Sequence, residues 1–253
     1  MTPDDRAHLL ALTNASSIET AWSMHVAKMA GYGFDRLLYG FTRYRTPTSL
    51  GDPNDFLVLT NHRPDYTREF IGNGLYRHSP MVRWALENEG PRSWSRTAAA
   101  LARGELSEDA RRVVAFNASK QVTAGYTIGF KSLSHRAKGA IALTARPGMT
   151  QEEVERIWSA HGETILLCNN VLHLRVLTLP YIPPDQTLTP RQREALEWVG
   201  DGKTTQDIAQ IMGLTQATVE KHLRRARDTL NVETSAQAVA KATFLNQMFI
   251  LDI

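Results

Sequence analysis

Basic side chains gather in one short stretch of this 253-residue chain. Between Lys203 and Leu230 the sequence reads KTTQDIAQIMGLTQATVEKHLRRARDTL. Its second half carries Lys221, Arg224 and Arg225, whose cationic groups could pair with the phosphates of a nucleic acid. Exposed lysines and arginines are commonplace, so a solvated basic helical hairpin explains the charge alone equally well. The choice between the two depends on the elements that position these side chains.

The apolar residues of this stretch follow a helical period. Spacings of four, three and four residues place them on one face of a helix, and they are Val219, Leu223, Ala226 and Leu230. Gly213 provides a tight turn after a shorter helix, TQDIAQIMG, whose expected N-cap is Thr205, and Thr215 caps the longer helix. Further helices are expected from Thr189 to Gly200 and over SAQAVAKATFLNQM. Short capped helices around a glycine turn, with the basic groups opposite the apolar stripe, favour a helix-turn-helix that enters the major groove of DNA.

Ten residues are candidates for contact with DNA. The expected phosphate contacts are Lys203, Thr205, Lys221 and Arg225. The side chains expected to face base edges are Gln216, Ala217, Glu220 and Arg224, of which Arg224 could bind guanine. Thr204 and Thr218 complete the set. The last 66 residues hold eight Lys/Arg and eight Asp/Glu, so this piece is neutral overall but polarised toward the candidate surface.

A proline-rich segment divides the chain. The stretch Leu177–Pro190 contains four prolines in 14 residues, which stop a helix and favour an extended linker. We therefore expect a first domain over residues 1–176, a linker over 177–187 and a second domain over 188–253. The second domain is expected to be all-α, with four helices.

The first domain mixes strands and helices. Strand patterns occur in DRLLYGFTRY, DFLVLT, GYTIGFKSL and GAIALTA, with helical patterns around them. The helix over SSIETAWSMHVAKMAGYGF, capped by Ser16 or Ser17, is expected to bury a stripe made of Ile18, Trp22, Val26 and Met29. Strands flanked by helices on both sides indicate an α/β/α sandwich, and the whole chain is expected to belong to the α+β class.

Composition excludes several other classes of protein. With 42% apolar and 22% charged residues, the chain has the composition of a globular protein, and its net charge of +3 alone does not indicate a nucleic-acid partner. The single cysteine, Cys168, excludes an intrachain disulfide and a CxxC metal site. A signal peptide, a membrane span, a nucleophile elbow and a zinc ligand set are not indicated. We therefore expect a cytoplasmic protein that is not an enzyme and needs no cofactor.

The last segment resembles a known family. The stretch from Leu188 to Ala242 resembles the DNA-binding domain of LuxR-type transcription regulators, and the matching residues are Leu188–Arg191, Leu196, Trp198, Gly202–Thr204, Ile208–Ala209, Thr218–Val219 and Gln237–Ala240. Gln192 and Asp207 stand where the family usually has Glu, but each keeps a polar group, so we expect the fold to be retained. The resemblance implies a homodimer, joined partly around Ala238–Leu245, that binds a palindromic site on double-stranded DNA.

The first domain resembles, more loosely, the autoinducer-binding domain of quorum-sensing regulators, over about residues 18–176. GFDRLLYGF is similar to one of its strands, and Tyr66, Phe70, Ser79–Pro80 and Trp94 keep the spacing of its signal-binding positions. In the family a Trp donates to the lactone carbonyl and an Asp accepts the amide N–H of the signal. Here Tyr66 can still donate and Ser79 can still accept, but without charge, and Phe70 cannot donate.

This less polar set favours a long-chain N-acyl-homoserine lactone, whose tail contributes affinity at about 0.8 kcal/mol per buried methylene. The candidate ligand-binding residues are Tyr66, Phe70, Ser79, Met81, Val82, Trp94 and Ala142. The alternative for the aromatic ones is core packing, which is the commoner role of such side chains. His62 and His78 flank these positions and are interpreted as structural or solvated.

Other functions remain open at this point. A phosphorylated receiver is not indicated, because the acidic pair Asp4–Asp5 precedes a helix and does not end a strand. A regulator of the same shape could act without a ligand or bind an unrelated one, because three of the four signal-binding positions are changed. The chain could also pair with a cognate regulator and silence it without binding DNA.

Overall fold

The computed structural model describes residues 1–46, 50–51, 53–132, 134–181 and 186–248. The chain divides into two compact units, Met1–Leu177 and Thr178–Ile253. Residues 182–185 of the expected linker and residues 249–253 of the expected second domain lie outside the described residues.

The first unit is built on a five-stranded antiparallel sheet. Its strands lie in the order β2-β1-β5-β4-β3, and every neighbouring pair runs antiparallel. The strands are β1 (Arg36–Thr42), β2 (Leu57–Thr60), β3 (Gly90–Ser93), β4 (Gly125–Gly129) and β5 (Lys138–Thr144). In the centre of the sheet, Leu38 pairs with Ala142 and Gly40 with Ala140. Because side chains alternate between the two faces, this register decides which residues face each layer of helices.

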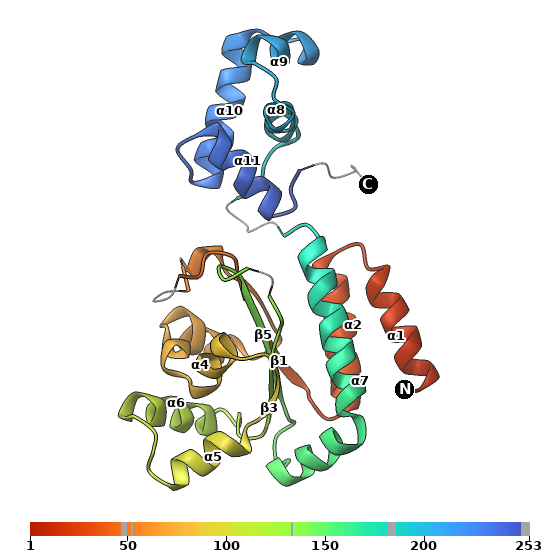
Figure 1. Ribbon diagram of the computed structural model, residues 1–253, viewed down its shortest axis with the longest axis vertical. Coiled ribbons are helices and arrows are strands. Elements are labelled where there is room, and N and C mark those ends of the chain that lie inside the picture. Colours follow the sequence, from red (N-terminus) through yellow and green to blue (C-terminus); the bar gives the residue numbers. More distant parts are fainter. Residues whose placement is uncertain (47–49, 52, 133, 182–185, 249–253) are drawn as a thin grey trace. The chain divides into compact units, whose positions relative to one another are not determined.

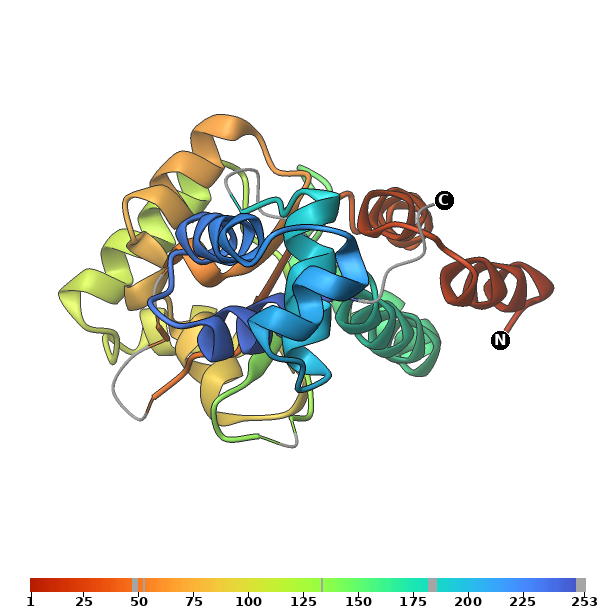
Figure 2. The ribbon, with the colours of Figure 1, turned by 90° about the horizontal axis from the view of Figure 1, so that it is seen from above.

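Helices cover both faces of the sheet, as Figure 1 shows. One layer consists of α1 (Pro3–Thr13), α2 (Ile18–Gly31) and α7 (Gln151–Thr178). Figure 2 views these helices nearly end on and shows them side by side. The other layer consists of α3 (Pro64–Thr67), a π-helical turn (Arg68–Gly72), a 3-10 turn (Leu75–His78), α4 (Pro80–Glu87), α5 (Ser95–Ala102) and α6 (Glu108–Ser119), with a further 3-10 turn at Pro53–Asp55. The predicted α/β/α sandwich is confirmed.

The layer formed by α1, α2 and α7 buries more polar groups than its sequence suggested. The predicted stripe of α2 is partly wrong, because the helix buries Ile18, Ala21, His25 and Met29 and leaves Trp22 and Val26 only half-buried. His25 can turn inward because its Nε2 lies 3.1 Å from Oδ1 of Asn169 on α7. Cys168, the residue before Asn169, is also fully buried.

The described part of the second unit consists of four helices, as predicted. They are α8 (Pro190–Gly200), α9 (Thr205–Met212), α10 (Gln216–Leu230) and α11 (Ser235–Phe244). The predicted N-cap of α9 is wrong by one residue: Thr204 occupies that position and Thr205 is the first helical residue. Gly213 ends α9 in the left-handed conformation with φ 65°, which a glycine adopts without strain.

Reciprocal capping boxes begin three of these helices. The pairs are Thr189 with Gln192, Thr204 with Asp207, and Thr234 with Gln237, and in each the threonine accepts a backbone N–H while its partner accepts that of the threonine. Gln192 and Asp207 are the two positions that depart from the LuxR pattern. Both carry an oxygen that completes the box, so the substitutions keep the function of the usual glutamate.

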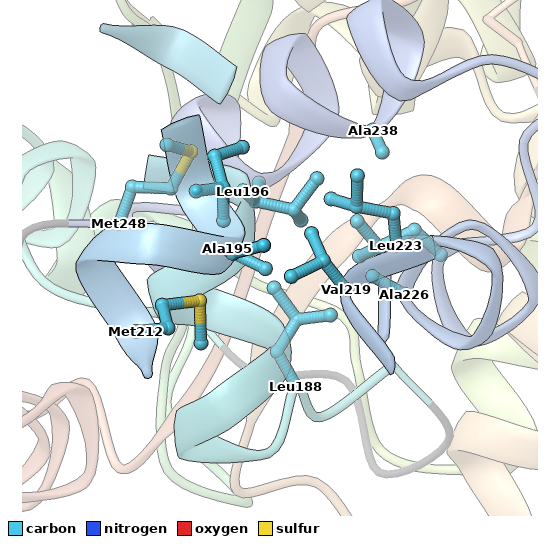
Figure 3. Packing of buried hydrophobic residues seen from close by; sticks show 13 residues of the cluster. Leu188, Ala195, Leu196, Met212, Val219, Leu223, Ala226, Ala238 and Met248 are labelled. Carbon is cyan, nitrogen blue, oxygen red and sulfur yellow. The ribbon is translucent and has the colours of Figure 1, made fainter. Parts of the chain in front are cut away.

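The core of the second unit is a cluster of thirteen buried apolar residues, contributed by all four helices and their flanking segments. Figure 3 shows Leu196, Val219 and Leu223 pointing toward one another from α8 and α10. The predicted stripe of α10 is confirmed, because Val219, Leu223, Ala226 and Leu230 are all buried. Burial of this stripe fixes which side of α10 faces solvent.

Candidate signal cavity and DNA-binding surface

The first unit contains a cavity of ≈ 290 Å³ between the sheet and the helical layer formed by α3 to α6. Its sheet wall includes Leu38, Gly40 and Thr42 of β1. The alternate residue Tyr39 points to the opposite face, where its hydroxyl lies 2.8 Å from Nδ1 of His173 on α7. The face of β1 that carries Leu38, Gly40 and Thr42 therefore forms the sheet wall of the cavity.

The floor of the cavity is hollow because its central row has almost no side chains. Gly40 on β1 pairs with Ala140 on β5, which pairs with Gly129 on β4. A Cβ atom added at Gly40 would meet no atom within 4 Å. The end of α4 covers Gly129 instead, since a Cβ there would lie 2.4 Å from the carbonyl oxygen of Asn88. The open space thus lies above Gly40 and Ala140.

The candidate residues Trp94 and Tyr66 are aromatic hydrogen-bond donors that line the cavity. The indole N–H of Trp94 donates to Oγ1 of Thr127 over 2.9 Å. The hydroxyl of Tyr66 donates to Oδ1 of Asn117 over 3.2 Å. Both donors already have partners within the protein, so a ligand would have to share or displace those contacts.

His62 belongs to the same end of the cavity. Its ring stacks on that of Tyr66 with centroids 4.4 Å apart, and its Nε2 lies 3.5 Å from Oγ1 of Thr144. Burial lowers the pKa of His62 to about 4, so the imidazole is neutral at pH 7 and has one donor and one acceptor nitrogen. The spacing along the chain does not mark His62 as a ligand-binding candidate, but the fold places its ring in the cavity wall, stacked on Tyr66.

Ser79 and Phe70 complete the candidate set on the helical side. The buried Ser79 is the N-cap of α4, where its hydroxyl accepts the backbone N–H of Val82 over 3.5 Å. Phe70 stacks on Tyr66 with centroids 5.2 Å apart. All seven candidate residues line the cavity, namely Tyr66, Phe70, Ser79, Met81, Val82, Trp94 and Ala142. The structure brings them together; their contact with a ligand is still a prediction.

The candidate DNA-binding residues lie on the exposed side of the helix-turn-helix formed by α9 and α10. Eight of the ten are exposed, and Thr205 and Thr218 are half-buried. None of the basic candidates forms an ion pair with a carboxylate of the described residues; these are Lys203, Lys221, Arg224 and Arg225. Arg227 differs from them, since its Nη1 donates to Oγ of Ser235 over 3.1 Å and holds α10 to α11.

Two family models match the chain. The autoinducer-binding domain matches residues 17–176, and the DNA-binding domain described as bacterial regulatory proteins, luxR family, matches residues 186–242. The chain belongs to the LuxR family of quorum-sensing transcription regulators. It is accordingly a DNA-binding regulator with an autoinducer-binding domain, and not an enzyme.

Curated relatives agree with this membership. The transcriptional activator protein AnoR of Acinetobacter nosocomialis is 25% identical over 218 residues, which cover 84% of this chain and 85% of that protein. The transcriptional activator protein LuxR of Aliivibrio fischeri is 22% identical over 199 residues, 78% of this chain and 76% of that protein. A solved structure of SdiA in complex with octanoyl-rac-glycerol shares the fold, with a TM-score of 0.50, 16% identity and coverage of 97% and 96%.

No helix in the described part of this LuxR-family chain is long and apolar enough to cross a membrane.

Proposed function

We propose that this regulator binds a long-chain N-acyl-homoserine lactone in the cavity and, as a cytoplasmic homodimer, reads a palindromic DNA site with α10. The observation that carries the proposal is the hollow floor at Gly40 and Ala140, which leads away from the polar end formed by Tyr66, His62 and Trp94. A lactone head group would lie at the polar end and the acyl tail along the hollow floor. DNA contacts would come from the ten exposed or half-buried candidates, which lie on α9, on α10 and at the two positions before α9.

The polar end supports a ligand whose affinity comes mainly from its tail. Tyr66 and Trp94 each donate to a partner within the protein, and Ser79 is uncharged and already caps α4. A neutral hydrogen bond contributes only about 1 kcal/mol net. Each buried methylene contributes about 0.8 kcal/mol, so a tail of several carbons outweighs the head-group contacts.

Binding would stabilise the folded sensor by mass action. A ligand present at one hundred times its Kd adds about 2.7 kcal/mol to the free energy of unfolding. The aromatic and aliphatic groups around the cavity lack packing contacts on the side that faces the open space, and a tail would supply them. The homodimer is proposed to form partly through α11, on which Phe244 is 49% exposed.

The ligand is tested by expressing the full chain with and without a panel of N-acyl-homoserine lactones and identifying by mass spectrometry what co-purifies. We expect one lactone per chain and a higher soluble yield. Good yield with an empty cavity would instead support a regulator that needs no lactone, an alternative favoured by the internal partners of Tyr66 and Trp94.

The reading of DNA is tested by comparing two neighbouring cations on α10. Arg224→Ala should weaken binding to the cognate site by about 1–3 kcal/mol and leave binding to random DNA nearly unchanged, because a base contact is lost. Lys221→Ala should weaken binding to both and reduce the salt dependence of log K by about one unit, because a phosphate contact is lost. Fluorescence anisotropy at several salt concentrations measures both effects.

If Arg224→Ala weakened binding to the cognate site and to random DNA equally, Arg224 would not be a base contact. A chain that binds no promoter fragment at all would support the silencing of a cognate regulator through a mixed dimer.

A further inference from the structure

The cavity has a second end that differs chemically from the first. Alternate residues of β5 line the cavity from its first end to its second, in the order Thr144, Ala142, Ala140 and Lys138. At about 3.3 Å per residue, the two ends of this row are about 20 Å apart. Thr144 lies beside His62 at the polar end, while Lys138 ends the row beyond the hollow floor.

Lys138 is a buried cation in the cavity wall. The residue is 8% exposed, and its Nζ donates to the carbonyl oxygens of Asn88 over 2.9 Å and Phe130 over 3.1 Å. An ammonium group has three donors, and two are used. No carboxylate of the described residues lies within ion-pair distance of it.

A second cation strengthens the positive potential at this end. Nη1 of Arg45 donates over 2.9 Å to the carbonyl oxygen of Leu86, a residue that lines the cavity. Burial lowers the pKa of Lys138, the charge of Glu89 opposes that shift, and the charge of Arg45 adds to it to a smaller extent. Burying a charge without a counter-ion is costly, so an anion arriving here would be stabilised.

A purely structural role would account for part of this arrangement. Asn88 is the C-cap of α4, and a cation near the C-terminus of a helix is favourable without any ligand. That role uses the carbonyl of Asn88, but it leaves the third N–H of Lys138 and the adjoining cavity unexplained. A neutral donor would serve the cap without burying a charge.

We propose that the Lys138 end of the cavity is a second polar subsite, which binds a carboxylate at the far end of the signal's acyl chain. This inference rests on the proposed function, since it assumes that the head group lies at the Tyr66 end. The preferred signal would then be an acyl-homoserine lactone whose tail ends in a carboxylate and not in a methyl group. Lys138 would determine this specificity, with Arg45 adding to the local potential.

The test compares three matched sets of ligands on the full chain. Decanoyl, dodecanoyl and tetradecanoyl homoserine lactones are each measured beside their ω-carboxylated forms and the methyl esters of those forms, and affinities are obtained by isothermal titration calorimetry. We expect the carboxylate of the best-fitting length to bind at least tenfold more tightly than its methyl ester. Lys138→Met, which keeps the length of the side chain, should abolish that preference and leave the plain lactone bound at least as tightly.

Lys131→Met is the matched control, because Lys131 is exposed and lies outside the cavity lining. It should keep the tenfold preference. If Lys138→Met does not fold, the ratio of carboxylate to methyl ester in the unaltered chain decides alone. If plain lactones bind but the carboxylated lactones bind no more tightly than their methyl esters, the second subsite is overturned and the proposed function stands. A chain that binds none of the ligands would overturn the proposed function together with it.

Discussion

The two units of this regulator fill their interiors in different ways. The helical unit buries an apolar cluster and, among the described residues, two polar side chains, Gln192 and Gln247. The described part of the sensor unit buries eleven polar or charged side chains and keeps a cavity above Gly40 and Ala140. Apolar packing gives the DNA-binding unit a core that is complete without a ligand, whereas the sensor holds polar groups and open space that a signal can use.

The largest expected difference between the two units is in their stability at low pH. Burial lowers the pKa of His62 and of His173 to about 4 and that of His25 to about 3, so the folded sensor holds these imidazoles neutral. The unfolded chain protonates them near 6.5, so it binds more protons below that pH and the free energy of unfolding falls as the pH falls. At pH 5 each histidine should cost about 2 kcal/mol, or about 6 kcal/mol together.

Hydrogen exchange at pH 8 and pH 5, corrected for its intrinsic pH dependence, measures this loss unit by unit. The helical unit contains a single histidine, the half-buried His222, and serves as the internal control. Equal loss of protection in both units would contradict the assignment of the acid response to the buried histidines.

The next largest effect should be a loss of stability in the helical unit when a buried side chain of its core is shortened. Leu196 is fully buried in its core, so Leu196→Ala leaves a cavity and should lower the free energy of unfolding by about 2–5 kcal/mol. Hydrogen exchange of peptides from α8 to α11 measures it. Leu10→Ala, at a residue that is 65% exposed, is the control and should change little. A loss below about 1 kcal/mol for Leu196→Ala would mean that this core collapses around the missing volume.

Adding a methyl group to the floor of the sensor cavity should raise the free energy of unfolding, and this is the smallest of the three expected effects. Gly40→Ala places its Cβ in open space and removes the extra chain entropy of a glycine in a strand, so it should raise the free energy of unfolding by about 0.5–1 kcal/mol. Because the methyl group occupies the path of the tail, the same variant should weaken long-chain lactones. Thermal unfolding with and without dodecanoyl homoserine lactone measures both.

Gly129→Ala is the contrast, since its Cβ would collide with the carbonyl of Asn88, and it should destabilise the unit. A destabilising Gly40→Ala would show that the floor is less open than the structure indicates.

The same contrast explains which parts could be predicted from sequence. The helical unit follows local rules: the stripe of α10 has a helical period, and Thr189 and Thr215 cap α8 and α10 where the sequence predicts. The predicted end of the fourth helix is wrong, because α11 stops at Phe244 and not at Met248. The misplaced cap at Thr205 shows the limit, because two adjacent threonines are equivalent until Asp207 completes a box with Thr204.

The sensor depends more on distant partners. Strand β3 reads Gly-Pro-Arg-Ser, which has no strand propensity; it forms because it pairs with β4 at the edge of the sheet, where a proline is tolerated. α1 and α5 were likewise not predicted. The predicted stripe of α2 contained Trp22 and not His25, whose buried Nε2 pairs with Oδ1 of Asn169, 144 residues away in the sequence. Spacing carried over from the family pointed to Tyr66 and Trp94, which line the cavity, while their contact with a ligand stays a prediction. The same spacing did not point to His62, which stacks on Tyr66.

The buried Cys168 provides a native chemical probe for opening of the sensor unit. It is the single cysteine, it is fully buried on α7, and burial raises the pKa of its thiol to about 11, so roughly one thiol in ten thousand is ionised at neutral pH. An alkylating reagent can therefore react only when the layer around α7 opens. The labelling rate, read by intact mass, then reports the opening of the sensor unit. The degree to which a candidate signal slows the labelling measures its occupancy, and no substitution in the chain is needed.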